Sequence, residues 1–537
     1  MSFSYHAGLY PYPSRREVVY GRKGMVCTSQ HLAAQAGLDV LKQGGNAVDA
    51  ALATAICLTV LEPTSNGIGS DLFALIWTGG RLHGINGSGP SPALLTRDRV
   101  TAAGYDAMPL RGWLPVMVPG APAAWAAIHD RFGRLPFERL FAAAIAYAEE
   151  GYAVMPTLAA MLAAEWDAFS DFRAQPAFAG LFSVFYPTGK PAQPGDLLKL
   201  PALGRTLRSL AASRCRSLYD GPIGAAVAAF SLQTGGLLRQ SDLAAYQPQW
   251  VDPICTNYRG YDIWEMPPNG QGLVVLMALN IASRMTFAQR DTVDTLHRQI
   301  EAMKLAFTDG KTHIADPNCM KTNTADLLAD AYAEKRYREI GAAALLPQPV
   351  DADNGGTVYL CTADEDGTMV SLIQSNFAGF GSGIVVPGYG ISLNDRGNNF
   401  SLDTASDNCV GPSKRSYHTI IPGFVTKNGD AVGAFGVMGA FMQPQGQFQV
   451  LMNTIDFHLN PQAALDAPRW QWLGGKKIEV ERGIPQALID GLTARGHEVS
   501  VNADPLPYGR GQIIWRNEDG VLTGATEPRA DGVVAAW

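Results

Sequence analysis

The chain has 537 residues, 47% of them hydrophobic and 17% charged, with a formal net charge of −7. This length and apolar content allow a large buried core, in one interwoven α/β unit or in several domains. The modest negative charge and the lack of any Lys/Arg run argue against nucleic acid as a partner. No apolar run reaches the length that spans a membrane, so we expect no membrane partner.

The N-terminal sequence MSFSYHAGLYPYPSRR lacks the basic start and apolar core of a secretory signal. Seven cysteines are scattered along the chain without any CxxC pair. This pattern is typical of reduced thiols that pack as small apolar side chains. We therefore expect a cytoplasmic protein.

The first predicted elements are a short strand at 25–27, two helices and a strand at 72–77. Ser29 can cap the first helix and Asn46 the second. A glycine-bearing loop, PTSNGIGSD, separates the second helix from the strand at 72–77. The glycines in this loop indicate tight turns or close approaches of other backbone.

The middle of the chain, residues 120–345, is predicted to be mostly helical. Its clearest helix covers 292–309, where apolar residues recur every three or four positions. Residues 355–537 change to short strands and turns. The sequence thus predicts a helix-rich first part and a strand-rich second part that share one structural unit.

The most informative stretch is DNGGTVYLCTADEDGTMVSLIQSN, residues 353–376. Thr357 follows two glycines and opens an alternating strand, and a turn sequence separates it from a second strand at 370–374. Val358, Leu360 and Thr362 are expected on one face of the first strand, and Tyr359, Cys361 and Ala363 on the other. The whole unit is predicted to be a β-hairpin.

A cut between Gly356 and Thr357 would give Thr357 a free α-amine beside its own hydroxyl, which places a nucleophile and a general base on one residue. Threonine is also simply a good strand residue, so the local pattern alone does not decide. The GxSxG, HExxH and Walker A signatures are absent. The nine histidines form no pair at metal-ligand spacing in the sequence, so we expect no metal centre and no cofactor.

Several longer segments resemble motifs of the γ-glutamyltranspeptidase family, and they occur in the family's order. They are SQHLAAQAGLDVLKQGGNAVDAALATAICLTVLEPTSNGIGSDLFALIW, TVYLCTADEDGTMVSLIQSN, FGSGIVVPGYGISLND, KRSYHTIIPG, GAFGVMGAF and NTIDFHLNPQAALDAPRWQW. The resemblance runs from about residue 17 to the end. It implies an α+β, four-layer αββα sandwich of the N-terminal-nucleophile type, formed by both halves of the chain.

The resemblance also implies a precursor that cuts itself between Gly356 and Thr357. The products would be a helix-rich large subunit, 1–356, and a strand-rich small subunit, 357–537, that stay together. A dimer of such heterodimers is one assembly that the resemblance allows. Thr357 would then attack a substrate amide with its own amine as the base, whose ordinary pKa is about 7.7–8.0.

Other catalytic roles follow from the matched motifs. Ser375 matches a hydroxyl that hydrogen-bonds the nucleophile. Gly439 and Ala440 match the pair whose backbone N–H groups form the oxyanion hole, where losing one donor costs about 3 kcal/mol.

The substrate-binding positions depart from the family pattern. The arginine that holds the α-carboxylate of a γ-glutamyl group is replaced by Gly87 or Ser88, and the acidic partner of the α-amine is replaced by Asn399. His418 and Thr419 replace a serine pair. Losing both partners of a zwitterion argues against a γ-glutamyl substrate, because a charged head group in a cleft would lack compensation.

Two residues are candidates for binding a carboxylate instead. Arg396 lies beside this region and can bind a carboxylate, or it can tie a strand end to backbone carbonyls. His418 can hydrogen-bond a carboxylate or carbonyl, or serve a structural role. Asn376, in the IQSN motif, completes the set of predicted substrate contacts with Asn399 and Thr419.

These features predict a self-cleaving threonine amidohydrolase that acts on a small acid amide. The signal-less members of the family with a short lid segment, which here lies between Phe400 and Lys414, and with an IQSN…GFGSGIV pattern are the most similar, and some of them resemble oxamate amidohydrolase. Oxamate, hydrolysed to oxalate and ammonia in purine-ring catabolism, is therefore the first candidate substrate. The alternatives are a γ-glutamyl hydrolase or transferase of the glutathione type, a glutaryl-type acylase, and an uncleaved, non-catalytic binding protein.

Overall fold

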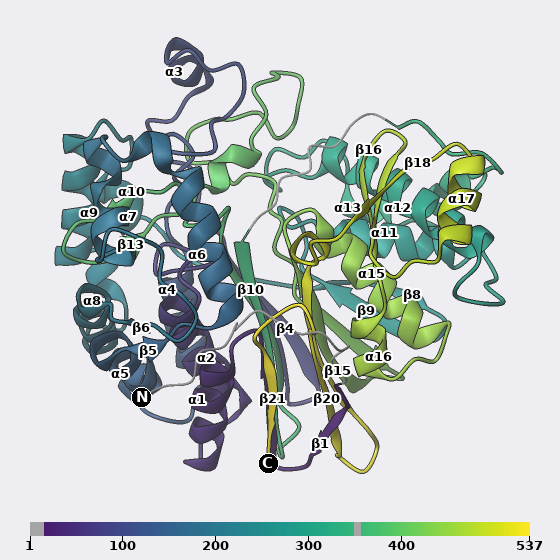
Figure 1. Ribbon diagram of the computed structural model, residues 1–537, viewed down its shortest axis with the longest axis horizontal. Helices are drawn as coiled ribbons and strands as arrows, with labels where there is room; N and C mark the ends of the chain where they lie inside the picture. The colour runs from purple at the N-terminus through teal and green to yellow at the C-terminus, as the bar shows by residue number, and fades with distance from the viewer. Residues whose placement is uncertain (1–15, 348–355) are drawn as a thin grey trace.

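The computed structural model describes residues 16–347 and 356–537, and it places two β-sheets face to face between two groups of helices (Figure 1). The first sheet has the order β21 (Val533–Ala536), β2 (Gly24–Thr28), β10 (Gly356–Asp364), β11 (Met369–Phe377), β3 (Asp71–Thr78), β4 (Arg81–Gly87), β7 (Gln249–Val251). The second has the order β1 (Val19–Gly21), β20 (Leu522–Thr526), β19 (Arg510–Arg516), β15 (Asp430–Met438), β14 (Gly423–Lys427), β9 (Tyr261–Glu265), β8 (Ile254–Tyr258).

Helices cover the outer face of each sheet (Figure 1). On the first sheet's side lie α1 (His31–Lys42), α2 (Ala47–Leu61), α4 (Ala121–Phe132), α5 (Ala142–Glu150), α6 (Pro156–Ala168), α7 (Ala179–Phe185), α8 (Pro201–Ala212), α9 (Pro222–Gln233) and α10 (Gln240–Ala244). On the other side lie α11 (Gly272–Ala282), α12 (Val293–His313), α13 (Thr324–Leu327), α14 (Asp330–Tyr337), α15 (Met442–Ile455), α16 (Pro461–Asp466) and α17 (Gln486–Ala494). The architecture is the predicted α+β sandwich with four layers.

Smaller elements complete the fold. They are α3 (Arg97–Ala102), the pairs β5 (Tyr152–Ala153) with β6 (Leu197–Leu198) and β12 (Val385–Val386) with β13 (Ile391–Ser392), and a three-stranded sheet of β16 (Trp470–Gly474), β17 (Lys477–Glu481) and β18 (Glu498–Asn502). Among the described residues, no helix has both the length and the apolar character needed to cross a bilayer.

Strand β10 is covered on both faces. Its side chains alternate between the two faces of the sheet, and all of its residues are buried. Val358 and Leu360 pack into the core beneath the first group of helices. Tyr359 and Cys361 pack into the layer between the two sheets. The predicted faces and the predicted hairpin with β11 are therefore confirmed, and a strand with both faces covered can hold its side chains rigidly.

Helix boundaries follow the predicted caps in one case and not in the other. Asn46 caps α2 with a full capping box, as predicted. The predicted cap of α1, Ser29, is wrong by one residue. The side chain of Gln30 accepts the N–H of Ala33 instead, while the Ser29 hydroxyl is bound to Glu62.

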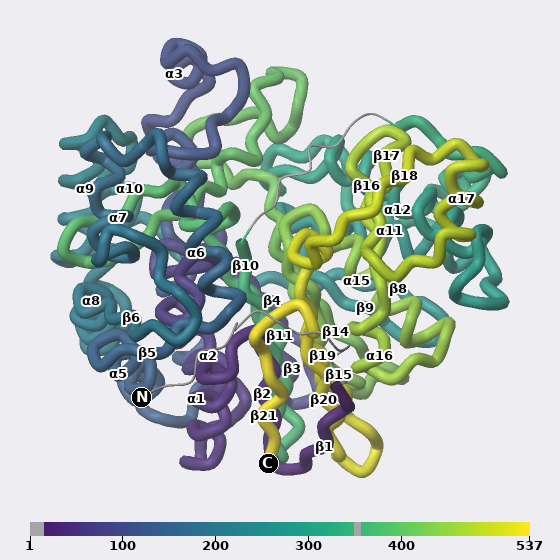
Figure 2. Tube along the Cα trace, in the orientation of Figure 1, coloured from purple at the N-terminus to yellow at the C-terminus, as the bar shows by residue number. Residues whose placement is uncertain are grey.

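The prediction of a mostly helical middle part missed its contribution to the sheets. Strand β7 closes one edge of the first sheet, and β8 and β9 close an edge of the second. Strands from the two ends of the chain also lie side by side, since β1 pairs with β20 and β2 with β21 (Figure 2). Both sheets thus mix strands from before and after Thr357. Residues 353–355 of the predicted cleavage segment, and 1–15, where a secretory signal was judged absent, lie outside the described residues.

Candidate active site

The candidate nucleophile lies at the start of β10, beside Ser375 on β11. Thr357 Oγ1 is 2.9 Å from Ser375 Oγ, which donates a hydrogen bond of 2.8 Å to the carbonyl oxygen of Gly356. Ser375 Oγ also accepts the N–H of Phe377 at 2.8 Å. Because the single Ser375 proton points to the Gly356 carbonyl, the Thr357 hydroxyl is the donor to Ser375. This arrangement holds the Thr357 oxygen next to the bond that it is predicted to break.

Gly356 is held against the loop that precedes β3. A Cβ atom at residue 356 would lie 3.0 Å from both the Cα of Ser65 and the carbonyl oxygen of Thr64. Only glycine allows this close backbone approach without a shift of the loop. The glycine before the predicted nucleophile therefore has a packing role as well as a chemical one.

A pocket of about 250 Å³ opens beside Gly356 and Gly439. Its apolar wall comes from α6 and from the segment before β19, and it also carries charged side chains. The remaining lining residues are Ala160, Met161, Ala164, Glu165, Gly379, Asp504, Leu506, Pro507 and Arg510. The sequence analysis found none of the charged residues of this wall, because they lie far from the matched motifs.

The predicted oxyanion residues lie where β15 ends. Gly439 has a φ of +140°, and a Cβ there would lie 3.0 Å from the Cα of Gly509, so the position requires glycine. The carbonyl oxygen of Ala440 accepts a hydrogen bond of 2.9 Å from Gln271 Nε2, which also binds the carbonyl oxygen of Thr419 at 2.7 Å. Gln271, a residue that sequence reasoning missed, thus fixes Thr419 relative to Ala440.

Arg396 is buried, with 1% of its surface exposed, and lies on the ring of Phe377 at 4.7 Å. Its Nε is 3.3 Å from Asp71 Oδ2, and its Nη1 donates to Thr419 Oγ1 at 2.6 Å. Its Nη2 has no hydrogen-bond partner among the residues that the structure describes. Arg396 therefore has a structural ion pair and, in addition, an unsatisfied donor group, and it lies on the ring of Phe377, the strand partner of Gly356.

His418 is fully buried between Asp71 and the ring of Phe73. Its Nε2 is 2.9 Å from Asp71 Oδ2, and its Nδ1 accepts the N–H of Ile420 at 3.3 Å. The proton is therefore on Nε2 and the ring is neutral. Burial, and next the nearby Arg396, lower the pKa of His418 to about 4. Both ring nitrogens are used within the protein, and Asp71, which this histidine orients, was missed by the sequence analysis.

The two predicted asparagine contacts also have partners in the protein. Asn376 accepts from Ser70 Oγ and donates to Ser392 Oγ, each at 2.9 Å. Asn399 donates to the carbonyl oxygen of Arg396 at 3.4 Å. Their roles as substrate contacts remain predictions.

A further group of charged residues supports the turn after β11. Asp395 Oδ1 accepts the N–H of Ala378 at 3.1 Å, and its Oδ2 lies 3.9 Å from Arg111 Nη1 with no hydrogen-bond partner among the described residues. Arg111 donates to the carbonyl oxygen of Gly379 at 2.7 Å and pairs with Glu165 at 3.4 Å. Burial raises the pKa of Asp395 to about 7, although Arg111 acts in the opposite direction.

Comparison with known proteins supports the fold and the family resemblance. The family model described as Gamma-glutamyltranspeptidase matches residues 33–537. The chain is 33% identical to a "Glutathione hydrolase-like YwrD proenzyme" of Bacillus subtilis, and 33% identical to an "Oxamate amidohydrolase proenzyme" of Klebsiella pneumoniae. Each match covers 96% of this chain and 98% of the relative.

Among solved structures, a cephalosporin acylase from Bacillus halodurans has a TM-score of 0.97 and 55% sequence identity, over 100% of this chain and 99% of that one. The family model and these full-length matches agree with the order of the motifs and with the four-layer fold. The chain belongs to the gamma-glutamyltranspeptidase family.

Proposed function

We propose that the chain is an amidohydrolase that cuts itself between Gly356 and Thr357 and then uses Thr357 to hydrolyse the amide bond of a small acid. The hydrogen bonds from Thr357 to Ser375 and from Ser375 to the Gly356 carbonyl support the first step. The word "proenzyme" in the names of both curated relatives supports it as well.

In the first step, Thr357 Oγ1 attacks the carbonyl carbon of Gly356. Its proton passes to Ser375, while Ser375 gives its own proton to the Gly356 carbonyl oxygen to which it is hydrogen-bonded. When the tetrahedral intermediate collapses, this proton moves to the Thr357 nitrogen and the bond between Gly356 carbon and Thr357 nitrogen breaks, which leaves an ester and a free α-amine. Water then hydrolyses the ester, so that Gly356 ends as a carboxylate and Thr357 as a new N-terminus. In turnover the α-amine takes the Thr357 hydroxyl proton as Thr357 forms an ester with the acyl group, and the leaving amine receives that proton. Water then hydrolyses the ester, which releases the acid and restores Thr357.

The observation that carries the substrate class is the unsatisfied Nη2 of Arg396. A buried guanidinium donor without a partner costs about 1–3 kcal/mol or more, and a bound carboxylate would remove that cost. Arg396 lies on the ring of Phe377, which is the strand partner of Gly356. A carboxylate held there would lie close to the carbonyl under attack.

A bound carboxylate close to the carbonyl under attack supports oxamate as the first candidate substrate, because the carboxylate of oxamate is bonded directly to its amide carbon. The relative from Klebsiella pneumoniae carries that activity in its name. The changes at residues 87–88 and 399 argue against a γ-glutamyl group, as the sequence analysis concluded. We propose hydrolysis of oxamate to oxalate and ammonia, a step of purine-ring catabolism.

A glutaryl-type acylase is the second candidate, and two observations favour it. The pocket of about 250 Å³ beside Gly356 and Gly439 is larger than oxamate needs, and much of its wall is apolar. The solved structure with 55% identity is described as a cephalosporin acylase. In this case the acid would have several carbons between its carboxylate and the scissile amide.

Incubating the purified protein with a series of acid amides tests both candidates. The series is oxamate, succinamate and glutaramate, with ammonia release measured, and glutaryl anilide and γ-glutamyl anilide, with aniline release measured. Oxamate as the best substrate confirms the first proposal, and glutaryl compounds as the best substrates support the second. A chain that remains full-length on a denaturing gel and releases nothing would refute both and favour the non-catalytic alternative.

We also propose that the two products remain associated in the cytoplasm. Both sheets mix strands from before and after Thr357, so separation would break both. All seven cysteines are free thiols, which fits a reducing compartment.

A further inference from the structure

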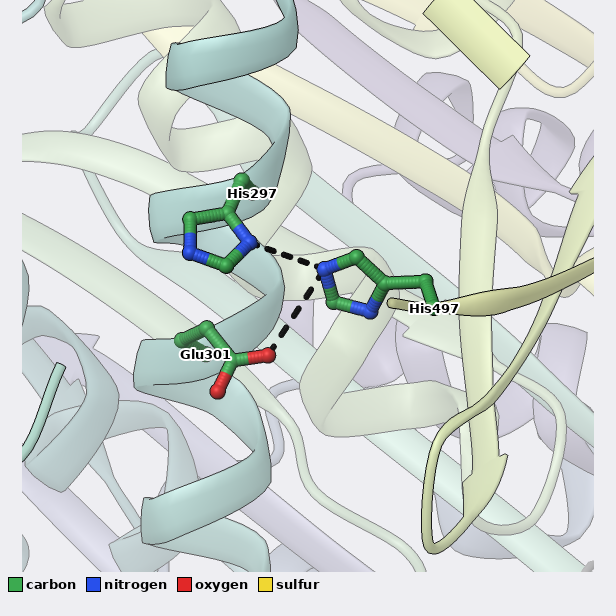
Figure 3. Close-up of side chains that lie close together, drawn as sticks. All are labelled: His297, Glu301 and His497. Atoms are coloured by element: carbon green, nitrogen blue, oxygen red, sulfur yellow. Dashed lines mark hydrogen bonds and ion pairs between the residues drawn. The ribbon is translucent and has the colours of Figure 1, made fainter. Parts of the chain in front are cut away.

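A second buried polar cluster lies far along the chain from the motifs of the active site. It consists of His297, Glu301 and Lys304 on α12 and His497, which lies between α17 and β18. Figure 3 shows His297, Glu301 and His497 of this cluster. All four side chains are buried. None of them lines the pocket beside Gly356. Their role is therefore separate from the chemistry of Thr357.

The hydrogen bonds of the cluster have one consistent direction. Lys304 Nζ lies 3.4 Å from His497 Nδ1 and can only donate, so the proton of His497 is on Nε2. His497 Nε2 then donates to His297 Nδ1 at 2.8 Å, and His297 Nε2 donates to the carbonyl oxygen of Gly341 at 2.9 Å. Both histidines are thus neutral, and burial lowers the pKa of each, to about 3 for His497.

Glu301 compensates the charge of Lys304 and also binds the backbone. Its Oε1 accepts from Lys304 Nζ at 2.8 Å, and its Oε2 accepts the N–H of Leu345 at 3.0 Å. Lys304 donates to the carbonyl oxygen of Leu345 at 3.3 Å, and the N–H of Ala344 donates to the carbonyl oxygen of Arg495 at 2.7 Å. No polar side-chain atom of the four-residue cluster lacks a partner among the described residues.

A metal ion would fit these residues poorly, although ligand atoms of His297, Glu301 and His497 lie within 4.8 Å of one another. A metal on His497 Nε2 requires the proton on Nδ1, where it would face the ammonium group of Lys304 instead of an acceptor. The ammonium group of Lys304 already forms an ion pair with the carboxylate of Glu301. Lys304 is therefore the cation of this cluster.

We propose that His297, Glu301, Lys304 and His497 form an interchain clamp that retains the end of the large subunit after self-cleavage. This inference rests on the proposed cut at Gly356–Thr357, because the clamp then joins three residues of the large subunit to His497 of the small subunit. The held backbone, residues 341–345, lies a short stretch of chain before the new C-terminus.

Hydrogen exchange measured by mass spectrometry on the matured protein tests the clamp. In His497→Asn and Glu301→Gln, peptides covering 341–345 are expected to exchange about tenfold faster or more than in the native protein. The two chains should also separate at a lower urea concentration. His458→Asn is the matched control, because His458 is an exposed histidine of the same subunit, and it should change neither result.

The outcomes separate this inference from the proposed function. Unchanged exchange at 341–345 in both variants of a properly cut protein would overturn the clamp alone. One equivalent of zinc bound by the native protein, and lost in His297→Ala, would also overturn it in favour of a metal centre. A chain that is never cut would overturn both the interchain role and the proposed function, and a denaturing gel of the same samples shows this directly.

Discussion

The active site and the interchain clamp are both buried polar clusters, but they differ in how fully their hydrogen bonds are satisfied. In the clamp, every polar side-chain atom has a partner among the described residues. In the proposed active site, by contrast, Arg396 Nη2 and Asp395 Oδ2 lack hydrogen-bond partners within the described chain.

The difference indicates what each cluster is for. A satisfied buried network makes the fold more specific and more rigid, and it needs no ligand. An unsatisfied buried donor or acceptor lowers stability, and a ligand can recover that free energy. Substitutions in the active-site cluster should therefore lower activity more than stability. Substitutions in the clamp should lower stability more than activity.

The largest effect is expected from Thr357→Ala, which removes the proposed nucleophile. We expect no cleavage and a loss of turnover of about 10³-fold or more, since nucleophile removal has effects of this size or greater. Denaturing gels and ammonia release measure both. Thr362→Ala, a buried threonine later in β10, is the matched control and should still be cut. If Thr357→Ala splits at the same bond, Thr357 is not the nucleophile.

Arg396→Lys tests the unsatisfied donor directly. The positive charge beside Asp71 remains, but the Nη2 donor is lost, so kcat/KM for the acid amide should fall about 10²-fold. Arg529→Lys is the control, because Arg529 is a buried arginine that binds Glu481 and the carbonyl oxygen of Ala467, and none of these residues lines the pocket beside Gly356. The control should lower stability and spare kcat/KM. Equal kcat/KM in native protein and Arg396→Lys would remove the basis for the proposed substrate class.

Gly439 and Ala440, the predicted oxyanion pair, offer a comparison within the proposed active site. Gly439→Ala should slow both cleavage and turnover about 10²-fold, because its φ of +140° and its contact with Gly509 exclude a side chain. Ala440→Gly should stay within a fewfold of native, since only its backbone is used. Time courses of chain cleavage on gels provide the rates, and similar rates for the two variants would contradict the assignment.

Asp395 should make stability depend on pH. Its folded pKa of about 7 lies above its unfolded value, so between about pH 4 and 7 the folded state holds a proton that the unfolded state has lost. The contribution of Asp395 to the free energy of unfolding is therefore fully present below about pH 4 and is lost as the pH rises to about 7. Asp395→Asn should raise the urea midpoint at pH 8 more than at pH 5. A difference that is the same at both pH values would show that Asp395 is ionised throughout.

The smallest effect on activity is expected from the clamp. Glu301→Gln should leave kcat within about twofold of native, although it weakens retention of residues 341–345, because the clamp contacts no pocket residue. Steady-state kinetics on freshly matured protein measure this. A large loss of kcat would show that the two clusters are coupled and would end the distinction between them.

The sequence by itself determined the β10–β11 hairpin, its two faces and the place of Thr357 and Ser375, because strand alternation and ordered motifs are local properties. It also identified Gly439 through the motif that contains it. The helical middle part was only partly predicted, since β7, β8 and β9 are short strands whose pairing partners lie elsewhere in the chain.

The tertiary structure alone decided which charged groups meet. Asp71, Arg396 and His418 come from three separate segments, and His497 meets His297 across 200 residues of chain. Spacing in the sequence cannot reveal such contacts, because the folding of both sheets brings these segments together. Whether a buried polar atom is satisfied depends on all of its neighbours, and so only the folded chain could distinguish the candidate substrate contact from the clamp.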